Sequence, residues 1–332
     1  MDVERRAVDP CGRPFPVYDD LAGSLLAAHC REDAGRDAAV AHVLGTCAGY
    51  AYADTQTVAM IMARLGLENG ACVRIAQAVD AMYIFSTAYL VQSRCGRVAI
   101  LCYRGTEPAN LGNWLADADV GSESMALGGE ALAVHSGFLR NVRATQWAVI
   151  RELNLALQGH SLLDPEKSVE HPLEALYVTG HSLGGAMAVL LALSLAGTAG
   201  HREIADKLRA VYTFGQPLAT GEPLPEAACA VARRLHRHIH GRDIVPSLPP
   251  AAWGRFAHFG MEYRYADGAW QCSDAPVAQL ANLREVPRAL LAFFAKAKRR
   301  ESTRFTMADH GPHLYVAALR PKGRVSELGD PG

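Results

Sequence analysis

A short glycine-rich segment near the middle of the chain contains the residue best suited to nucleophilic chemistry. Residues 180–184 read Gly-His-Ser-Leu-Gly and fit the pattern G-x-S-x-G, with Ser182 at its centre. The apolar run 175–179 predicts a strand, and the small-residue run 183–195 predicts a helix. A sharp turn between them would expose the serine Oγ at a helix N-terminus, where amide dipoles favour developing negative charge. We therefore predict that Ser182 is a nucleophile; a loop that only packs a helix on a sheet is the alternative.

A serine nucleophile needs a histidine base, and the base needs an acid that orients it. On a strand–turn–helix of this kind the acid follows the serine in the chain and the histidine comes last. Asp243 follows the predicted strand 235–240 in a loop bounded by glycine and proline, and such loops collect active-site residues at a sheet edge. Asp267 and Asp274 lack this context, so Asp243 is the candidate acid. A solvated turn aspartate is the alternative interpretation.

The base is expected late in the chain, where two histidines lie close together. His310 and His313 are the last two of the 13 histidines. His258 is a weaker candidate, because it follows Asp243 by only 15 residues. We predict that His310 or His313 is the base, with a solvated surface histidine as the alternative for either one.

These side chains require a sheet whose strand ends meet at one edge, and the pattern along the chain predicts such a sheet. Two runs of β-forming residues, 82–92 and 97–104, flank a turn and predict a hairpin. Predicted strands then alternate with helices. This alternation is typical of an α/β fold with a doubly wound, mostly parallel sheet and helices on both faces. The helices are predicted at 138–158 and 183–195, and the strands at 175–179, 210–214 and 235–240.

The whole chain, residues 1–332, is expected to form a single domain, because no repeat, linker or break in composition interrupts it. Residues 1–20 are expected to be an irregular leader. Apolar residues at helical spacing predict an N-terminal helical segment over 33–67. Residues 105–137 are expected to be a loop.

Composition excludes several classes of protein. The residues are 50% hydrophobic and 20% charged, which argues against disorder, and the net charge of -1 argues against a nucleic-acid partner. The eight cysteines show neither a CxxC pair nor zinc-ligand spacing, so no metal or other cofactor is expected. No secretory signal is visible, and the longest apolar stretch, 186–196, is shorter than the roughly 20 residues that span a bilayer. We expect a cytoplasmic protein without a transmembrane segment, with secretion as the alternative.

With these candidates in place, the sequence resembles the class 3 lipase family, the fungal-type lipases of the α/β-hydrolase superfamily. The resemblance covers residues 103–315 and follows the family's order of motifs. Together the motifs are specific, whereas each one alone is weak. They are Tyr-Arg-Gly-Thr at 103–106, Asn-Trp-Leu-Ala-Asp at 113–117, Val-His-Ser-Gly-Phe at 134–138, the serine segment at 180–185, Thr-Phe-Gly-Gln-Pro at 213–217, Asp-Ile-Val-Pro at 243–246 with Leu-Pro-Pro at 248–250, and Phe-Ala-His-Phe-Gly-Met-Glu at 256–262.

The resemblance implies a role for each candidate. Ser182 would be the nucleophile and Asp243 the orienting acid. Thr106 would donate to the oxyanion of the tetrahedral intermediate, and Leu183 would supply a second donor through its backbone N–H. A hydroxyl that satisfies its own loop is the alternative for Thr106. The family's Asp-His pattern with a tyrosine five residues later favours His310, whereas its His-Leu-x-Tyr pattern favours His313; we favour His310.

The resemblance also implies a substrate. It predicts a serine hydrolase of carboxylic esters, a lipase or esterase that acts on acylglycerols or similar acyl esters through an acyl-enzyme. Residues 107–115 would be an apolar lid that makes transient contact with a lipid interface, with a packed loop as the alternative. A phospholipase A1, a thioesterase or a polyester hydrolase would fit the same motifs. A non-catalytic relative that binds a lipid or a protein is the other alternative.

Overall fold

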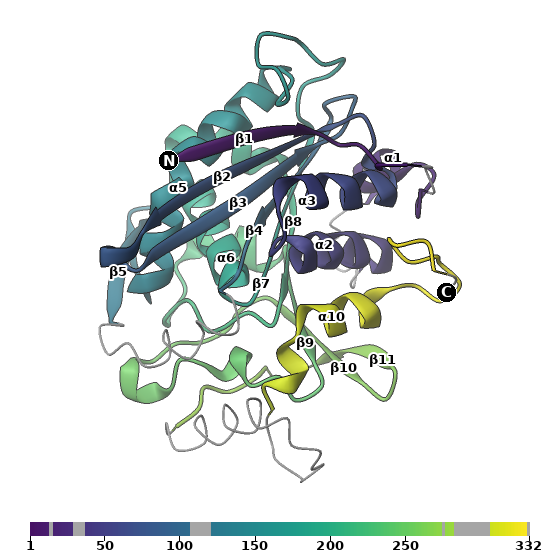
Figure 1. Cartoon of the computed structure of the whole chain (residues 1–332). Helices are drawn as coiled ribbons and strands as arrows, with labels where there is room; N and C mark the ends of the chain where they lie inside the picture. The colour runs from purple at the N-terminus through teal and green to yellow at the C-terminus, as the bar shows by residue number, and fades with distance from the viewer. Residues whose placement is uncertain (13–15, 29–36, 107–120, 274–275, 282–305, 331–332) are drawn as a thin grey trace.

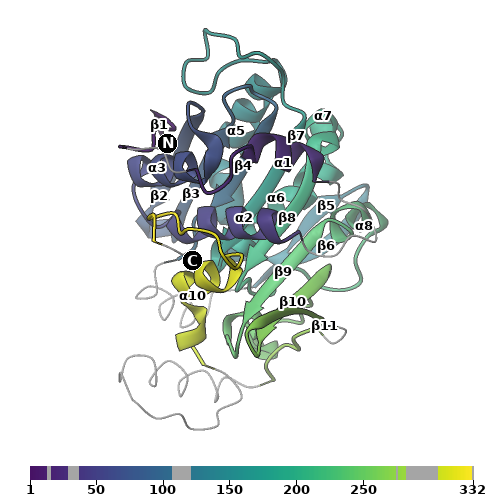
Figure 2. The ribbon, with the colours of Figure 1, turned by 90° about the vertical axis from the view of Figure 1, so that its right-hand side faces the viewer.

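A nine-stranded sheet forms the centre of the protein in the computed structural model (Figures 1 and 2). The structure describes residues 1–12, 16–28, 37–106, 121–273, 276–281 and 306–330. The strands, in their order across the sheet, are β1 (Asp2–Ala7), β2 (Ala71–Val79), β3 (Ile84–Gln92), β4 (Val98–Tyr103), β7 (Ala175–His181), β8 (Leu208–Phe214), β9 (Leu235–His240), β10 (Met261–Ala266) and β11 (Ala269–Ser273). A separate hairpin pairs β5 (Ser122–Leu127) with β6 (Glu130–His135).

The sheet is parallel at its centre and antiparallel at its margins. The neighbours β4, β7, β8, β9 and β10 run parallel, whereas β1 to β4 and the β10–β11 pair are antiparallel. Parallel strands bring their carboxyl ends to a common edge, which is where the loops after β4, β7, β8 and β9 begin. The expected α/β fold with helices on both faces is confirmed.

Two layers of helix cover the sheet, one on each face (Figure 1). The helices are α1 (Leu21–Ala27), α2 (Ala38–Tyr50), α3 (Thr55–Met62), α5 (Ser136–Leu157), α6 (Leu183–Gly197), α7 (Arg202–Lys207), α8 (Cys229–Ala232) and α10 (Pro312–Leu319). Of the range 33–67 that the sequence predicts to be helical, α2 and α3 are helices, and α3 continues into a π-helical turn at Ala63–Leu67 in which Gly66 departs from helical geometry.

Alternation along the strands divides the core between these layers. Successive strand residues face opposite sides, so Ile100 packs with the layer of α1–α3 and α10, whereas Leu101 packs with α5 and α6. Helix α6 consists of Leu, Ala, Gly, Met and Val with a single Ser, and it is buried on nearly every side, as a helix that is apolar all round should be.

The N-terminal strand corrects an expectation. The sequence predicts an irregular leader over 1–20, but Asp2–Ala7 forms β1, which pairs antiparallel with β2. Its residues are mostly charged and show no apolar face, so the pattern gives no strand signal. The strand is fixed by tertiary contact instead: the Arg5 guanidinium donates two hydrogen bonds of 2.8 Å to the buried Glu152 carboxylate.

Two other expectations on organisation have different outcomes. The predicted loop at 105–137 contains the β5–β6 hairpin, whose strands are short and whose exposed residues are serine, alanine and glutamate. That residues 1–332 form a single domain stays a prediction.

Within the described ranges no single helix is long and apolar enough to cross a membrane. Helix α6 and the segment Ala199–Lys207 meet that test only as a pair bent by 105°.

Several histidines are buried where a positive charge would lose its hydration. Burial lowers the pKa of His42 and of His236 to about 4, and that of His135 to about 3. These side chains are neutral in the folded protein at neutral pH. In the unfolded chain they take up a proton near pH 6.5, so protons favour the unfolded state between that pH and the folded pKa.

We therefore predict that the protein loses stability as the pH falls from about 7 to 5. His236 alone should contribute about 2 kcal/mol to this loss, because its depressed pKa makes its contribution full above pH 6.5 and absent near pH 4. Urea unfolding at both pH values should show that His236→Phe loses less unfolding free energy between pH 7 and 5 than the wild type does. Phenylalanine keeps the stacking on Tyr212 but does not titrate. The control is His171→Phe at an exposed site, and a loss in His236→Phe equal to that of the wild type would contradict the assignment.

Candidate active site

The turn between β7 and α6 holds Ser182 in a conformation that few residues adopt. Its backbone lies at φ 58° and ψ -131°, and its N–H donates to the Phe214 carbonyl at 2.8 Å. A non-glycine residue at positive φ is strained, and such strain is typical of functional turns. The turn is tight because helix and strand approach closely: a Cβ on Gly184 would lie 2.1 Å from the Tyr103 carbonyl oxygen. The sequence pattern and the structure therefore agree on the position of the serine.

Asp243 lies in the loop after β9 and is held by three donors. Its Oδ1 accepts a hydrogen bond from the Val245 N–H at 2.9 Å. Its Oδ2 accepts one from the Tyr315 hydroxyl at 2.6 Å and another from His310 Nδ1 at 2.8 Å. The side chain is buried, so these contacts fix its orientation without competition from water.

His310 joins the carboxylate to the serine. Its Nδ1 contacts Asp243 Oδ2, and its Nε2 lies 2.9 Å from Ser182 Oγ. Because Asp243 accepts the Nδ1 proton, the hydrogen-bond network assigns Nε2 as the acceptor for the serine hydroxyl. Nucleophile, base and acid thus form one continuous chain of hydrogen bonds, which is the arrangement that activates a serine.

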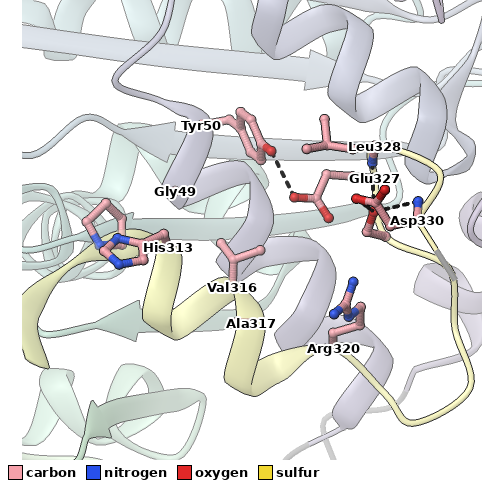
Figure 3. A pocket seen from close by; sticks show the side chains of 11 residues that line it. Gly49, Tyr50, His313, Val316, Ala317, Arg320, Glu327, Leu328 and Asp330 are labelled. Atoms are coloured by element: carbon pink, nitrogen blue, oxygen red, sulfur yellow. Dashed lines mark hydrogen bonds between the residues drawn. The ribbon is translucent and has the colours of Figure 1, made fainter. Parts of the chain in front are cut away.

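His313 lies elsewhere, although it follows His310 by only three residues. It is exposed and lines a cavity of about 400 Å³ between the end of α2, α10 and residues 326–330 (Figure 3). Across that cavity the Tyr50 hydroxyl donates to Glu327 Oε1 at 2.8 Å. The structure therefore brings His310, and not His313, to the serine.

The other candidates from the sequence are also separate from this chain. His258 is buried, and its Nε2 bonds the Pro246 carbonyl oxygen at 2.7 Å. Burial lowers the pKa of His258 well below its usual range, so it is a neutral structural side chain. Asp267 lies in the β10–β11 turn, and Asp274 is outside the described residues. Within the described part of the chain no His, Cys, Asp and Glu side chains gather as a metal site.

The two expected oxyanion donors lie on chain segments next to the serine. Leu183 is the first residue of α6, directly after Ser182. Thr106 follows the carboxyl end of β4, the neighbour of β7 in the sheet. The segment before it passes close to the nucleophile, since a Cβ on Gly105 would lie 3.1 Å from Ser182 Cβ. The predicted lid, 107–115, falls outside the described residues.

Comparison with known proteins finds lipases. The model of the class 3 lipase family matches residues 100–253, so this part of the chain is similar to that family. A lipase from Rhizomucor miehei is 31% identical over 186 residues, which are 55% of this chain and 46% of that protein. A secreted mono- and diacylglycerol lipase from Gibberella zeae is 30% identical over 140 residues, which are 39% of this chain and 30% of that protein.

The chain therefore spans less than half the length of these curated relatives. A solved structure shares the fold over a greater length. The crystal structure of a lipase from Rhizopus microsporus var. chinensis is 20% identical, with a TM-score of 0.53, over 90% of this chain and 93% of that one. This likeness shows a shared fold, and it extends to parts of this chain that the family model does not match.

Further hydrogen bonds, from residues that the sequence did not single out, support His310. His181 Nε2 donates to the His310 carbonyl oxygen at 2.8 Å, and its Nδ1 lies 2.8 Å from the Tyr52 hydroxyl. Burial, and then the neighbouring His310, lower the pKa of His181 well below its usual range, so the ring is neutral. No local pattern links Tyr52 to a histidine 129 residues later.

Tyr315 was visible in the sequence only as a motif residue, but the structure gives it a contact. Its hydroxyl donates to Asp243 and accepts from the His240 N–H at 3.1 Å. Burial, and then the Asp243 carboxylate, raise the pKa of Tyr315 well above its usual range, so the hydroxyl keeps its proton. It therefore remains a donor to the carboxylate at neutral pH.

Access to the serine is narrow in this structure. Ser182 is 1% exposed and His310 is 6% exposed. Both side chains are therefore shielded from bulk water in this structure.

We predict that Gly215→Ala slows the reaction of Ser182 with a fluorophosphonate probe by at least about tenfold. At this position φ is +60°, and the new Cβ would lie 2.8 Å from Asp243 Oδ2 and 2.9 Å from the His310 ring, so the pair must shift. The control is Gly268→Ala, which has a similar backbone (φ +78°) but open space around it. Equal labelling rates for the two variants, measured by mass spectrometry, would contradict this assignment.

Proposed function

We propose that the protein is a serine hydrolase of carboxylic esters that acts on acylglycerols or similar acyl esters. The observation that carries the proposal is the continuous hydrogen-bonded chain from Asp243 through His310 to Ser182. It lies on the strained turn of a class 3 lipase region, where a serine is set up to attack a carbonyl.

In the first half of the proposed reaction, His310 Nε2 takes the proton from Ser182 Oγ as the oxygen attacks the ester carbonyl. The carbonyl oxygen becomes an oxyanion that the Leu183 N–H and Thr106 stabilise. Asp243 holds the ring and stabilises the imidazolium. His310 then gives the proton to the alcohol oxygen, the C–O bond breaks and the acyl group stays on Ser182.

In the second half, water takes the place of the alcohol. His310 removes a proton from the water, and the resulting oxygen nucleophile attacks the acyl-enzyme through a second oxyanion. Ser182 leaves and recovers its proton from His310, and the carboxylic acid is released. All the proton transfers pass through one side chain, so no step in this scheme calls on a cofactor.

Support for an acylglycerol substrate comes from two sources. The relatives carry the names lipase and mono- and diacylglycerol lipase. The burial of Ser182, which is 1% exposed, also suits an uncharged ester better than a charged one. As for location, the expectation of a cytoplasmic protein finds no support among these relatives. One of them is named as secreted, and we propose secretion for this protein too.

The test of the proposed function is hydrolysis by the wild type and by Ser182→Ala. The wild type should hydrolyse 4-nitrophenyl esters and a triglyceride emulsion. Ser182→Ala should lose about 10⁴–10⁶-fold in kcat, because no other group supplies the nucleophile. Ser124→Ala, on an exposed strand of the small hairpin, is the control. Turnover retained by Ser182→Ala, with folding verified by circular dichroism, would sink the scheme.

A second prediction concerns the base. His310→Ala should reduce kcat/KM to the level of Ser182→Ala, whereas His313→Ala should keep it within about threefold, because only His310 contacts the serine. His310 lies just before α10 and His313 lies in its first turn, so each variant controls for the other. An active His310→Ala enzyme would show that another group takes the proton.

A further inference from the structure

We propose that the tip of the β2–β3 hairpin, formed by Met82, Tyr83 and Phe85, docks on the surface of an uncharged acylglycerol phase. Three apolar side chains at this tip would enter the lipid and hold the catalytic edge of the sheet against it. The inference rests on the proposed function, because it names the surface from which the site draws its substrate.

Exposure singles out the tip. Met82 is 52% exposed, Tyr83 is 67% exposed and Phe85 is 55% exposed, although the three lie within four consecutive residues. The other large apolar side chains with such exposure, among those described, are separated along the chain, as Trp147 and Leu328 are. Single exposed apolar residues are ordinary, but a cluster of them marks an interaction surface.

The backbone at the tip indicates that the outward aromatic ring is not there for stability. Tyr83 lies in the left-handed region at φ 51° and ψ 37°, where glycine and asparagine are favoured. An aromatic residue in this conformation is strained, and here it gains little burial in return. Strain that brings no packing is the kind of outlier that points to a function.

The tip is nevertheless held firmly in place. The side chain of Asn141, on the first turns of α5, accepts a hydrogen bond from the Phe85 N–H at 2.9 Å through Oδ1. Its Nδ2 donates to the Gly137 carbonyl at 2.9 Å and to the Tyr83 carbonyl at 3.5 Å. Because Asn141 is itself buried, the three apolar side chains project from a fixed support and need little ordering on contact.

Strand register places the tip at the catalytic edge, the edge of the sheet where β4 and β7 end and where Ser182 lies. Ala88 of β3 lies opposite Tyr103 of β4, and Tyr103 lies opposite Gly180 of β7. Ser182 follows Gly180 at the end of β7, and Phe85 precedes Ala88 in the antiparallel strand, so both lie toward the same edge of the sheet. A strand advances about 3.3 Å per residue. Measured from the level of Ala88, Tyr103 and Gly180, the tip therefore reaches at least as far as Ser182 does.

Charge indicates which lipid surface the tip fits. Residues 80–85 read Asp-Ala-Met-Tyr-Ile-Phe and carry one acidic and no basic side chain. An anionic membrane attracts basic segments and would repel Asp80. An uncharged acylglycerol surface imposes no such penalty, and tyrosine suits it because the ring enters the apolar phase while the hydroxyl stays hydrated.

The test uses the variant Met82→Ser/Tyr83→Asn/Phe85→Thr, in which asparagine suits the left-handed backbone and threonine suits the strand. Adsorption to a triolein emulsion is measured by flotation in a Ser182→Ala background, so that no turnover changes the surface. The partition coefficient should fall at least about tenfold, while the melting temperature stays the same or rises. With Ser182 intact, hydrolysis of dissolved 4-nitrophenyl butyrate should stay within twofold of the wild type. Trp147→Ser, which removes an aromatic ring of similar exposure from α5, should leave adsorption unchanged.

Each contrary outcome has a definite meaning. Undiminished adsorption of the triple variant would overturn the proposal. A loss of activity on dissolved 4-nitrophenyl butyrate as large as the loss of adsorption would also overturn it, because the tip would then be a structural part of the site. A loss of binding confined to phosphatidylglycerol vesicles would overturn it as well. A wild-type protein that adsorbs through the tip but hydrolyses no ester would refute the proposed function and leave the docking surface standing.

Discussion

The hydrogen bond between Asp243 Oδ2 and His310 Nδ1 is the contact on which the rest of the site depends. It joins two segments 67 residues apart in the chain, and it fixes both the tautomer and the direction of the imidazole ring. With the ring fixed, Nε2 faces Ser182 Oγ, which the strained turn holds within hydrogen-bond distance. Without it, the serine would be an ordinary hydroxyl at the start of a buried helix.

Different elements of the fold position the two partners of this hydrogen bond. Asp243 is positioned by the parallel strand β9 and by the backbone of its own loop. His310 is positioned by α10, which packs on α2 and buries Tyr315 and Leu319 in the core of the N-terminal helices. The Tyr315 hydroxyl then reaches back to Asp243, so α10 supports the acid as well as the base. Burial of every member keeps these hydrogen bonds free of competing water.

The sequence predicted what local pattern determines. The pattern around Ser182 requires a strand, a turn and a helix within about 20 residues, and Asp243 follows a recognisable strand. The edge strand β1 was missed because its charged residues show no apolar period, and its place depends on the Arg5–Glu152 contact across the fold. The support from Tyr52 was missed for the same reason, since nothing near it in the sequence refers to His181.

The packing of α10 on α2 also bears on what counts as the functional unit of the chain. Residues 100–253, the part that matches the family, contain Ser182 and Asp243 but neither His310 nor the helices on which α10 rests. A fragment cut to those limits would have a nucleophile and an acid with no base between them. The stretches on either side, which the family match does not cover, thus contribute His310 and the helices that position it. The proposed reaction depends on these flanking residues as much as on the motif around Ser182.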